Sequence, residues 1–441
     1  MNIKNIISVS LVLLLLSGVG CTSNTNSGVL TDDLSNSKIA PYNAFHSGSI
    51  MLDNNGRHIN AHGAGFLYDN GRYYMFGEHK LGGKLGNRAL VGVHCYSSDD
   101  LYNWRDEGVV LKMNDNPESP LFIGTIIERP KVVFNKKTGK YVLWAHLEKR
   151  KGPTAKSSKL DVILDEKPDY NTAGVIVATA DKITGPYNFV RSMRINAGKY
   201  PINCNLENLK KAIAKYKDSD YSKINGWTIK NGKYTTDDLF AKDFKNGQMS
   251  RDMTIFVDDN QIAYLITASE GNATLHIHEL TDDYTNTTGK FTRNFMLGYH
   301  EAPAIFKAKG KYYMFSSHCT GWAPNPGRIS VADSMLGEWK ELGNPCRGEG
   351  QKATKFTQEA TAETTFRSQS TYVIKVQGKK DAFIYVGDRW NPTDAIDGRY
   401  IFLPVEWEGD MPIIKWYDKW DLSFFDKKIN RTFYLSKSLR E

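Results

Sequence analysis

Short apolar segments separated by polar turns run through most of the chain, and five of them share one layout. Each begins with an apolar strand, passes through a polar turn and ends with a second apolar or aromatic strand; the Asn70-Gly71 pair in the first copy is a strong hairpin signal. The five copies span residues 64–76, 130–144, 253–266, 302–315 and 371–385. A hairpin repeated in this way predicts a β-propeller with one hairpin in each blade.

A second, weaker repeat follows three of the hairpins, as a short strand that ends in a small polar turn and an aromatic residue. Its copies span residues 96–104, 178–187 and 331–339, and residues 400–425 alternate apolar and polar positions. These segments supply outer strands and complete the last blade or the ring closure. We therefore predict an all-β fold, a single five-bladed propeller over residues 40–441. A β-sandwich of unrelated hairpins shows similar strand spacing and is the alternative.

The repeat is interrupted between the second and third hairpins. Residues 196–249 are polar and contain a helical stretch from Leu206 to Tyr216. We expect a partly helical insertion in the connection between the second and third blades, placed over one face of the propeller, where it could wall the site.

The N-terminus has the pattern of a lipoprotein export signal. A short basic start is followed by an apolar run at residues 6–16 and by small residues at 17–20, directly before Cys21. The apolar run is shorter than the roughly 20 residues that a transmembrane helix needs. We expect residues 1–20 to be a signal peptide, Cys21 to carry a lipid anchor and residues 21–39 to be a flexible tether. The protein would then be exported to the periplasmic or cell-surface face of the outer membrane.

Charge and cysteine content narrow the function classes. Lys and Arg number 57 and Asp and Glu 49, a net charge of +8 that is spread along the chain, so basic clusters such as residues 149–151 indicate solvated surface and not a nucleic-acid site. Aromatic residues make up 12% of the chain, which fits either a β core or a surface that stacks on sugar rings. The cysteines after Cys21 match no zinc spacing, which leaves a disulfide or buried thiols. They are Cys95, Cys204, Cys319 and Cys346.

Polar residues stand directly before all five hairpins. Because the innermost strand of each propeller blade begins near the central axis, we expect these side chains to meet at one end of the channel. A lone acidic residue is more often part of a structural salt bridge, but polar residues at five corresponding positions favour a site. Glycoside hydrolysis needs a protonated acid and a second group that activates water, which carboxylates here would supply. The residues are His62, Glu128, Arg129, Arg251, Asp252, Glu301 and Gln369.

Several short motifs in combination resemble the family 43 glycoside hydrolases, and within them the exo-acting β-1,3-galactanases. The resemblance covers roughly residues 59–407. The motifs are Ala-His-Gly-Ala-Gly at 61–65, Phe-Gly-Glu-His-Lys at 76–80, Glu-Arg-Pro-Lys-Val at 128–132, Ser-Arg-Asp at 250–252, Glu-Ala-Pro at 301–303, Thr-Gly-Trp-Ala-Pro-Asn-Pro at 320–326 and Gly-Asp-Arg-Trp at 387–390.

The resemblance implies an inverting hydrolase with Glu301 as the general acid. Most of the family takes its general base from an Asp at the start of the first blade, but residues 61–65 offer no carboxylate. In the galactanase-like group a Gln on the last blade is thought to position or activate the water, and Gln369 matches it. Glu128 matches a Glu that helps to hold the terminal sugar and is the alternative base. The resemblance also implies sugar contacts by Glu78, Arg129, Tyr170, Asp252, Asn272, Thr320 and Trp322.

The residues themselves support the assignment of the acid. Apolar neighbours and the acidic field of Asp252 are expected to raise the pKa of Glu301. Trp322 lies in a loop pattern after the fourth hairpin, where an exposed indole can stack on a sugar ring or anchor the loop. The histidines form no HExxH-type cluster, so no metal site is assigned and no cofactor is expected, although the family resemblance leaves a structural calcium in the central channel open.

The predicted function is hydrolysis of β-1,3-linked galactose in galactan or arabinogalactan side chains. An arabinofuranosidase or β-xylosidase of the same fold is one alternative. A non-catalytic surface protein that binds glycans is another, although three acidic groups in one pocket argue against it. The expected partner is a polysaccharide or oligosaccharide, with no nucleic acid, with membrane contact only through the lipid, and with the protein acting as a monomer.

Overall fold

The computed structural model describes residues 41–83, 91–116, 118–148, 170–215, 224–354 and 358–426. From Pro41 onward the chain forms one compact unit. The predicted signal peptide, Cys21 and the tether lie outside the described residues. None of the helices in the described part of the chain has the length and hydropathy to span a bilayer.

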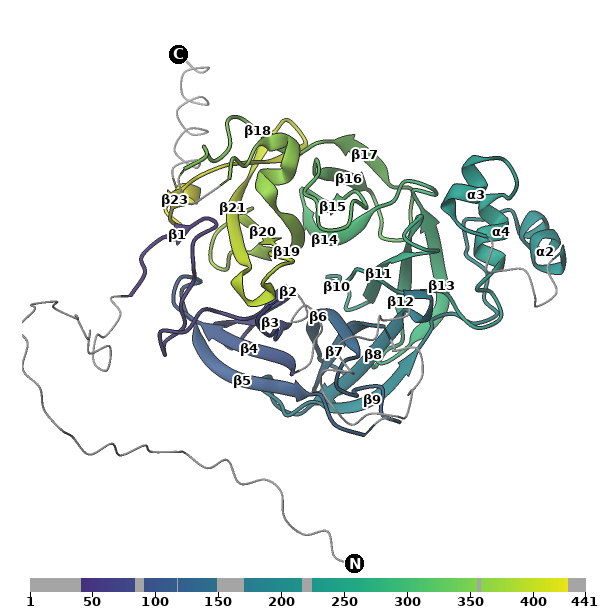
Figure 1. The fold of residues 1–441 in the computed structure, drawn as a ribbon, viewed down its shortest axis with the longest axis horizontal. Helices are drawn as coiled ribbons and strands as arrows, with labels where there is room; N and C mark the ends of the chain where they lie inside the picture. The colour runs from purple at the N-terminus through teal and green to yellow at the C-terminus, as the bar shows by residue number, and fades with distance from the viewer. Residues whose placement is uncertain are drawn as a thin grey trace, which may run out of the picture. The chain divides into compact units, whose positions relative to one another are not determined.

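Five sheets, antiparallel except for one parallel pair at the edge of the fifth, surround a common centre, which confirms the predicted five-bladed propeller (Figure 1). The inner hairpin of every blade coincides with one of the five repeats found in the sequence. Blade one is β2 (His62–Asp69), β3 (Arg72–Glu78), β4 (Gly92–Ser98) and β5 (Arg105–Lys112), and blade two is β6 (Ile126–Asn135), β7 (Lys140–Glu148), β8 (Gly174–Ala180) and β9 (Asn188–Met193). Blade three is β10 (Met253–Val257), β11 (Ala263–Ser269), β12 (Thr274–Leu280) and β13 (Thr287–Asn294), and blade four is β14 (Glu301–Ala308), β15 (Lys311–Ser317), β16 (Arg328–Ala332) and β17 (Lys340–Gly343).

The fifth blade completes the ring with strands from two parts of the chain. Its order is β18 (Cys346–Arg347), β22 (Met411–Lys415), β21 (Arg399–Glu408), β20 (Phe383–Arg389) and β19 (Gln369–Lys375). The segment that the sequence assigned to the last blade therefore supplies its outer strands. In addition, β1 (Phe45–His46) pairs with β23 (Lys419–Trp420), so the two ends of the described chain are tied together.

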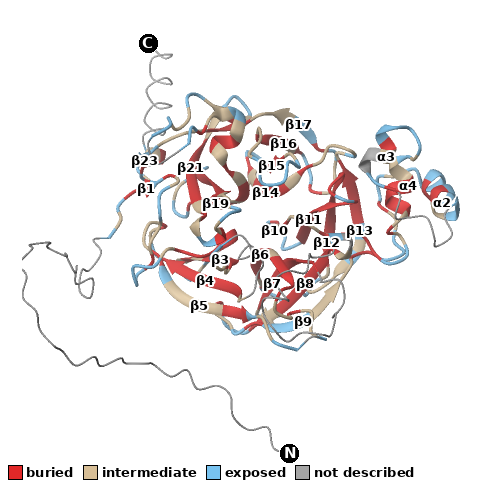
Figure 2. Ribbon diagram, in the orientation of Figure 1, coloured by how far each residue is buried: buried red, intermediate tan, exposed pale blue. Residues whose placement is uncertain are grey.

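Large side chains fill the spaces between neighbouring blades. Trp144 of blade two is fully buried, and its indole nitrogen donates to the carbonyl oxygen of Tyr284 in blade three at 2.7 Å. At the ring closure, Phe45 stacks on Trp420 with ring centroids 4.5 Å apart. Figure 2 shows the strands mostly buried and the connecting loops exposed. Because loss of a buried tryptophan side chain typically costs about 3–5 kcal/mol, these contacts hold the blades in fixed positions around the axis.

The insertion between blades two and three forms α2 (Leu206–Lys215), α3 (Gly226–Lys230) and α4 (Thr236–Ala241). These helices lie beyond the outer strand β13 (Figure 1). Leu209 and Phe240 pack on Phe291 of that strand, because burial of their apolar faces also covers an exposed sheet edge. The insertion therefore does not lie over the face of the propeller as expected. It approaches the site through Ala273 and Tyr299, which pack with residues of α3 and α4 and neighbour Asn272 and Glu301 in the chain.

Candidate active site

β-Bulges open the inner hairpins of four blades, at the positions where the sequence placed the polar residues. A bulge inserts one extra residue and re-aims the neighbouring side chain, here toward the ring centre. The inserted backbone takes up positive φ at Gly63 (61°), Arg129 (53°) and Ala302 (54°). The register shifts lie between His62 and Gly65, Glu128 and Lys131, Glu301 and Ala304, and Ser370 and Tyr372.

The guanidinium and backbone of Arg129 link four blades. Its backbone N–H donates to Glu78 Oε1 at 2.8 Å, its Nε forms an ion pair with Asp252 Oδ2 at 3.0 Å, and its Nη2 donates to Gln369 Oε1 at 2.6 Å. Burial opposes the charge of Arg129, but Asp252, Asp388 and Glu78 raise its pKa well above the usual range. Arg129 is thus a fixed cation that holds three of the predicted sugar-binding or catalytic residues in place.

The amide of Gln369 is oriented by three neighbours. Gln369 Oε1 accepts hydrogen bonds from Arg129 Nη2 at 2.6 Å and from Trp390 Nε1 at 3.0 Å, while Nε2 donates to Ser317 Oγ at 3.0 Å. Because Arg129 and Trp390 are both obligatory donors, the oxygen and not the nitrogen of the amide must face them. The second N–H of Nε2 is left to hold a water molecule or a sugar hydroxyl.

The carboxyl of Glu301 stands at the start of β14 beside a second acidic residue. Asn272 Nδ2 donates to Glu301 Oε1 at 2.5 Å, and Asp252 Oδ2 accepts from the backbone N–H of Ala302 at 3.1 Å. Burial, followed by the charge of Asp252, raises the pKa of Glu301 to about 7, against the opposing effect of the Cys319 thiol. Glu301 is therefore partly protonated at neutral pH, as a general acid must be.

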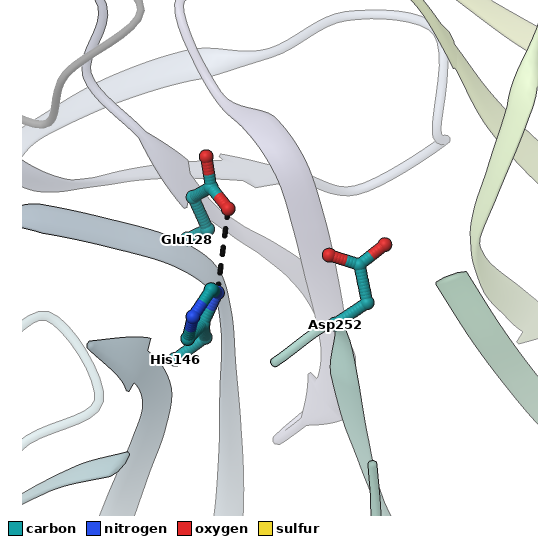
Figure 3. Close-up of side chains that lie close together, drawn as sticks. All are labelled: Glu128, His146 and Asp252. Carbon is teal, nitrogen blue, oxygen red and sulfur yellow. Dashed lines mark ion pairs between the residues drawn. The ribbon is translucent and has the colours of Figure 1, made fainter. Parts of the chain in front are cut away.

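The buried side chain of His146 forms an ion pair with Glu128, and Figure 3 shows both residues beside Asp252. His146 Nδ1 is 3.3 Å from Glu128 Oε2, and His146 Nε2 is 3.1 Å from Glu148 Oε1. Burial disfavours the imidazolium, but the two carboxylates raise the pKa of His146 to about 9. Burial likewise disfavours ionised Glu128, but His146, Lys80 and Arg129 lower the pKa of Glu128 to about 2. At the pH values near 7 where Glu301 is partly protonated, Glu128 is therefore ionised.

Glu128, His146 and Asp252 also have the spacing of a metal site, with ligand atoms within 4.8 Å of one another. A protonated imidazole has no free lone pair for a metal, and Asp252 already binds Arg129. Nearby, Lys131 Nζ donates to the carbonyl oxygens of Gly63 at 2.8 Å and Arg129 at 3.3 Å. These groups do not fit a cation, and whether the central channel holds a structural calcium, which the resemblance left open, is not tested.

Aromatic side chains line the entrance. Trp322 is 47% exposed and meets Trp390 edge to face, with centroids 5.6 Å apart, in a cleft of about 460 Å³ that also includes Gln369. Tyr170 is 50% exposed and lies under the Arg251 guanidinium at 4.8 Å. The hydroxyl of Thr320, in contrast, donates to Ala323 O at 2.6 Å and accepts from Asn325. Thr320 thus holds the Trp322 loop.

Two site residues were not singled out from the sequence. Trp390 belongs to the Gly-Asp-Arg-Trp motif, and its position just after β20, opposite Gln369, was the available signal. Cys319 lies 3.6 Å from Asn272 Nδ2 and interacts with Glu301. All four cysteines in the described residues carry free thiols, so the disulfide alternative is wrong. The buried-thiol alternative holds for Cys95 and Cys346.

Comparison with known proteins gives the family. The profile of "Glycosyl hydrolases family 43" matches residues 222–412. A β-1,3-galactosidase of this family, solved with galactodeoxynojirimycin, is 42% identical, with 86% of this chain and 100% of that chain covered and a TM-score of 0.73.

Exo-β-1,3-galactanases from two organisms are also similar. The enzyme from Phanerochaete chrysosporium, solved with β-1,3-galactotriose, is 29% identical over 86% of this chain and 68% of that one, with a TM-score of 0.62. The enzyme from Clostridium thermocellum is 29% identical over 85% and 66%, with a TM-score of 0.62. A search of the curated proteins gave no match. The chain therefore belongs to family 43 of the glycoside hydrolases.

Proposed function

We propose that this glycoside hydrolase is an exo-acting β-1,3-galactosidase that releases galactose from galactan or arabinogalactan side chains with inversion. The observation that carries the proposal is the pairing of Glu301, whose pKa is raised to about 7, with the oriented amide of Gln369. The names of the similar enzymes support the substrate, since they are β-1,3-galactosidases and exo-β-1,3-galactanases.

Glu301 is the general acid in this proposal. Its proton moves to the glycosidic oxygen as the bond between that oxygen and the anomeric carbon breaks, and the leaving sugar departs as a neutral alcohol. Asn272, which donates to Glu301 Oε1, orients the carboxyl. Asp252 keeps Glu301 protonated through its negative charge, and Arg129 in turn holds Asp252.

Glu128 and Gln369 share the activation of water. Gln369 Oε1 already accepts two hydrogen bonds, so the free N–H of the amide is suited to hold the water oxygen. Glu128 is the ionised carboxylate that receives the proton as the water attacks the anomeric carbon. If Gln369→Ala keeps full activity while Glu128→Gln loses it, Glu128 alone is the base and the shared role is wrong.

The substrate is tested by incubating the purified protein with β-1,3-galactan, arabinoxylan and matching aryl glycosides. Galactose should be the first product, and NMR of the newly formed sugar should show the inverted anomer. Glu301→Gln should lose most activity on galactan oligomers while its far-UV circular dichroism stays unchanged. Release of xylose or arabinose instead of galactose would refute the substrate, and a retained anomer would refute the mechanism.

We also propose that the enzyme is a monomer anchored to an outer-membrane surface by a lipid on Cys21. The export-signal pattern before Cys21 supports the anchor. In cell fractionation, the unaltered protein should remain with membranes and Cys21→Ala should not. Equal distribution of the two proteins between membrane and soluble fractions would contradict the anchor. Sedimentation of the soluble Cys21→Ala protein should give the mass of a single chain, as expected of a monomer.

A further inference from the structure

The cleft at Gln369 and Trp322 continues over blade five, where its wall is rich in arginine. Arg367, Arg389 and Arg399 line it together with one carboxylate, Asp397, in addition to neutral residues. Asp397 is bound to Arg399, with Oδ1 2.6 Å from Nη1. Within the described residues, Arg367 and Arg389 have no acidic partner. The cleft therefore holds two uncompensated positive charges beside the catalytic pocket.

Arg389 is a fixed cation. Its Nε and Nη2 donate to the carbonyl oxygen of Phe366 at 3.0 and 2.9 Å, and its Nη1 donates to Gln351 Oε1 at 2.7 Å. The guanidinium also lies 4.7 Å from the centre of the Trp416 ring. These contacts use three of the five N–H groups of the side chain and leave two for a ligand. Burial and the neighbouring Arg367 lower the pKa of Arg389 to about 10.

Arg367 is held next to Arg389 by an unusual backbone. Thr365, Phe366 and Arg367 have φ of 50°, 54° and 58°, three consecutive residues in a region that L-amino acids disfavour. The turn is stabilised by the bonds from Arg389 to Phe366 O and by the bond from the Arg367 backbone N–H to Thr364 Oγ1 at 3.3 Å. Strained backbone of this kind is concentrated at functional sites. Here it places one half-buried guanidinium near another without an anion between them.

We propose that Arg367 and Arg389 form a subsite for an anionic sugar, a uronic acid or a sulfated residue, attached to the galactan that occupies the catalytic pocket. A guanidinium fork matches the two oxygens of a carboxylate or sulfate. A neutral galactan gives no reason to keep two unpaired cations in the cleft. Since Gln369 lines the same cleft, a sugar linked to the bound galactan reaches these arginines. The proposal rests on the proposed β-1,3-galactosidase function.

The test compares kcat/KM on three versions of one arabinogalactan oligosaccharide. The first carries glucuronic acid, the second is the same compound with its carboxyl reduced to the alcohol, and the third carries a sulfate ester on the corresponding sugar. We expect the unaltered enzyme to prefer the glucuronic acid or the sulfated form over the reduced form by about tenfold or more, because a charge-assisted pair is lost on reduction. The form with the larger preference identifies the anion. Equal kcat/KM on all three would overturn the proposal.

Arg367→Gln removes one charge from a side chain that bonds to nothing in the described residues, so the fold should be unaffected. Arg367→Gln should lose most of the preference, Arg367→Lys should keep part of it, and both should cleave neutral β-1,3-galactan at the rate of the unaltered enzyme. A preference unchanged in Arg367→Gln would overturn the subsite.

A failure of the proposed function is distinguishable from a failure of the subsite. If neutral β-1,3-galactan is not cleaved, binding of the glucuronic acid compound and of its reduced form to the unaltered enzyme can still be compared by calorimetry. Tighter binding of the acidic form, weakened in Arg367→Gln, would support the subsite although the proposed hydrolysis had failed. Equal binding would overturn it.

Discussion

The pH dependence of catalysis should be set by the raised pKa of Glu301, to which the charge of Asp252 contributes. The pKa of Glu301 is raised from 4.5 to about 7, by burial first and by Asp252 second. The difference of 7 − 4.5, about 2.5 pH units, corresponds to about 3.4 kcal/mol in favour of the neutral carboxyl. At pH 7 about half of the enzyme then carries the acid proton, against about one molecule in 300 for an unperturbed glutamate.

We therefore expect kcat/KM on a galactan oligomer to fall as the pH rises through about 7, where Glu301 loses its proton. Asp252→Asn removes the second cause of the raised pKa of Glu301 and leaves burial, the first, so the alkaline limb should move to lower pH. The measurement is kcat/KM between pH 4 and 10. A dinitrophenyl galactoside, whose leaving group needs no proton, should lack this limb in both proteins.

Asp282→Asn is the matched control, because Asp282 is an exposed aspartate paired with Lys137 on the surface. Asp282→Asn should leave the alkaline limb of kcat/KM at the same pH. Circular dichroism and thermal unfolding should show that Asp252→Asn is folded, since Asp252 also accepts the Ala302 backbone N–H. An alkaline limb that stays in place in Asp252→Asn, or that appears equally with the dinitrophenyl substrate, would refute Glu301 as an acid tuned by Asp252.

Three further predictions concern neighbouring groups. Cys319→Ala removes a thiol that lowers the pKa of Glu301, so the alkaline limb should move to higher pH; no movement in kcat/KM profiles would contradict the contact. Trp322→Ala should raise KM by about tenfold through lost stacking while the melting temperature stays unchanged, because the indole is 47% exposed. His146, with its pKa raised from 6.5 to about 9, should stabilise the fold fully below pH 6.5 and lose this effect as the pH rises through 9. Thermal unfolding should show that loss, and His146→Gln should abolish it.

The hairpins and their order could be predicted from the sequence because alternation and turn residues are local signals. The five inner hairpins follow the five repeats, and α2 (Leu206–Lys215) matches the predicted helical stretch as far as the described residues reach. The gathering of Glu128, Asp252, Glu301 and Gln369 around Arg129 followed from the repeat alone, since corresponding positions in a ring face the same axis. The sequence did not show that β-bulges turn the side chains of Glu128, Glu301 and Gln369 inward.

Other features depend on pairings that no local pattern encodes. The insertion lies where a strand buries Leu209 and Phe240. That strand is the outer edge of blade three, which contributes Phe291 to the contact. The roles of Trp390 and Cys319 require knowledge of which loop faces Gln369 and Glu301. Both residues come from segments that follow the second strand of a hairpin, where the repeat no longer predicts direction.

The missing carboxylate at the first blade has a structural cause. His62 is 1% exposed, stacks on Tyr400 with centroids 5.1 Å apart and lies 3.6 Å from Asp388, so it faces the seam with blade five and not the open pocket. A side chain at Gly63 would meet Glu78 Oε1 at 2.3 Å. Neither position can therefore hold a free carboxylate. An Asp in place of His62 would disrupt the packing between blades one and five, and an Asp in place of Gly63 would clash with Glu78. An anion that faces the attacking water would have to come from another blade, and in the proposed mechanism that anion is Glu128, which is paired with His146 and acts together with Gln369.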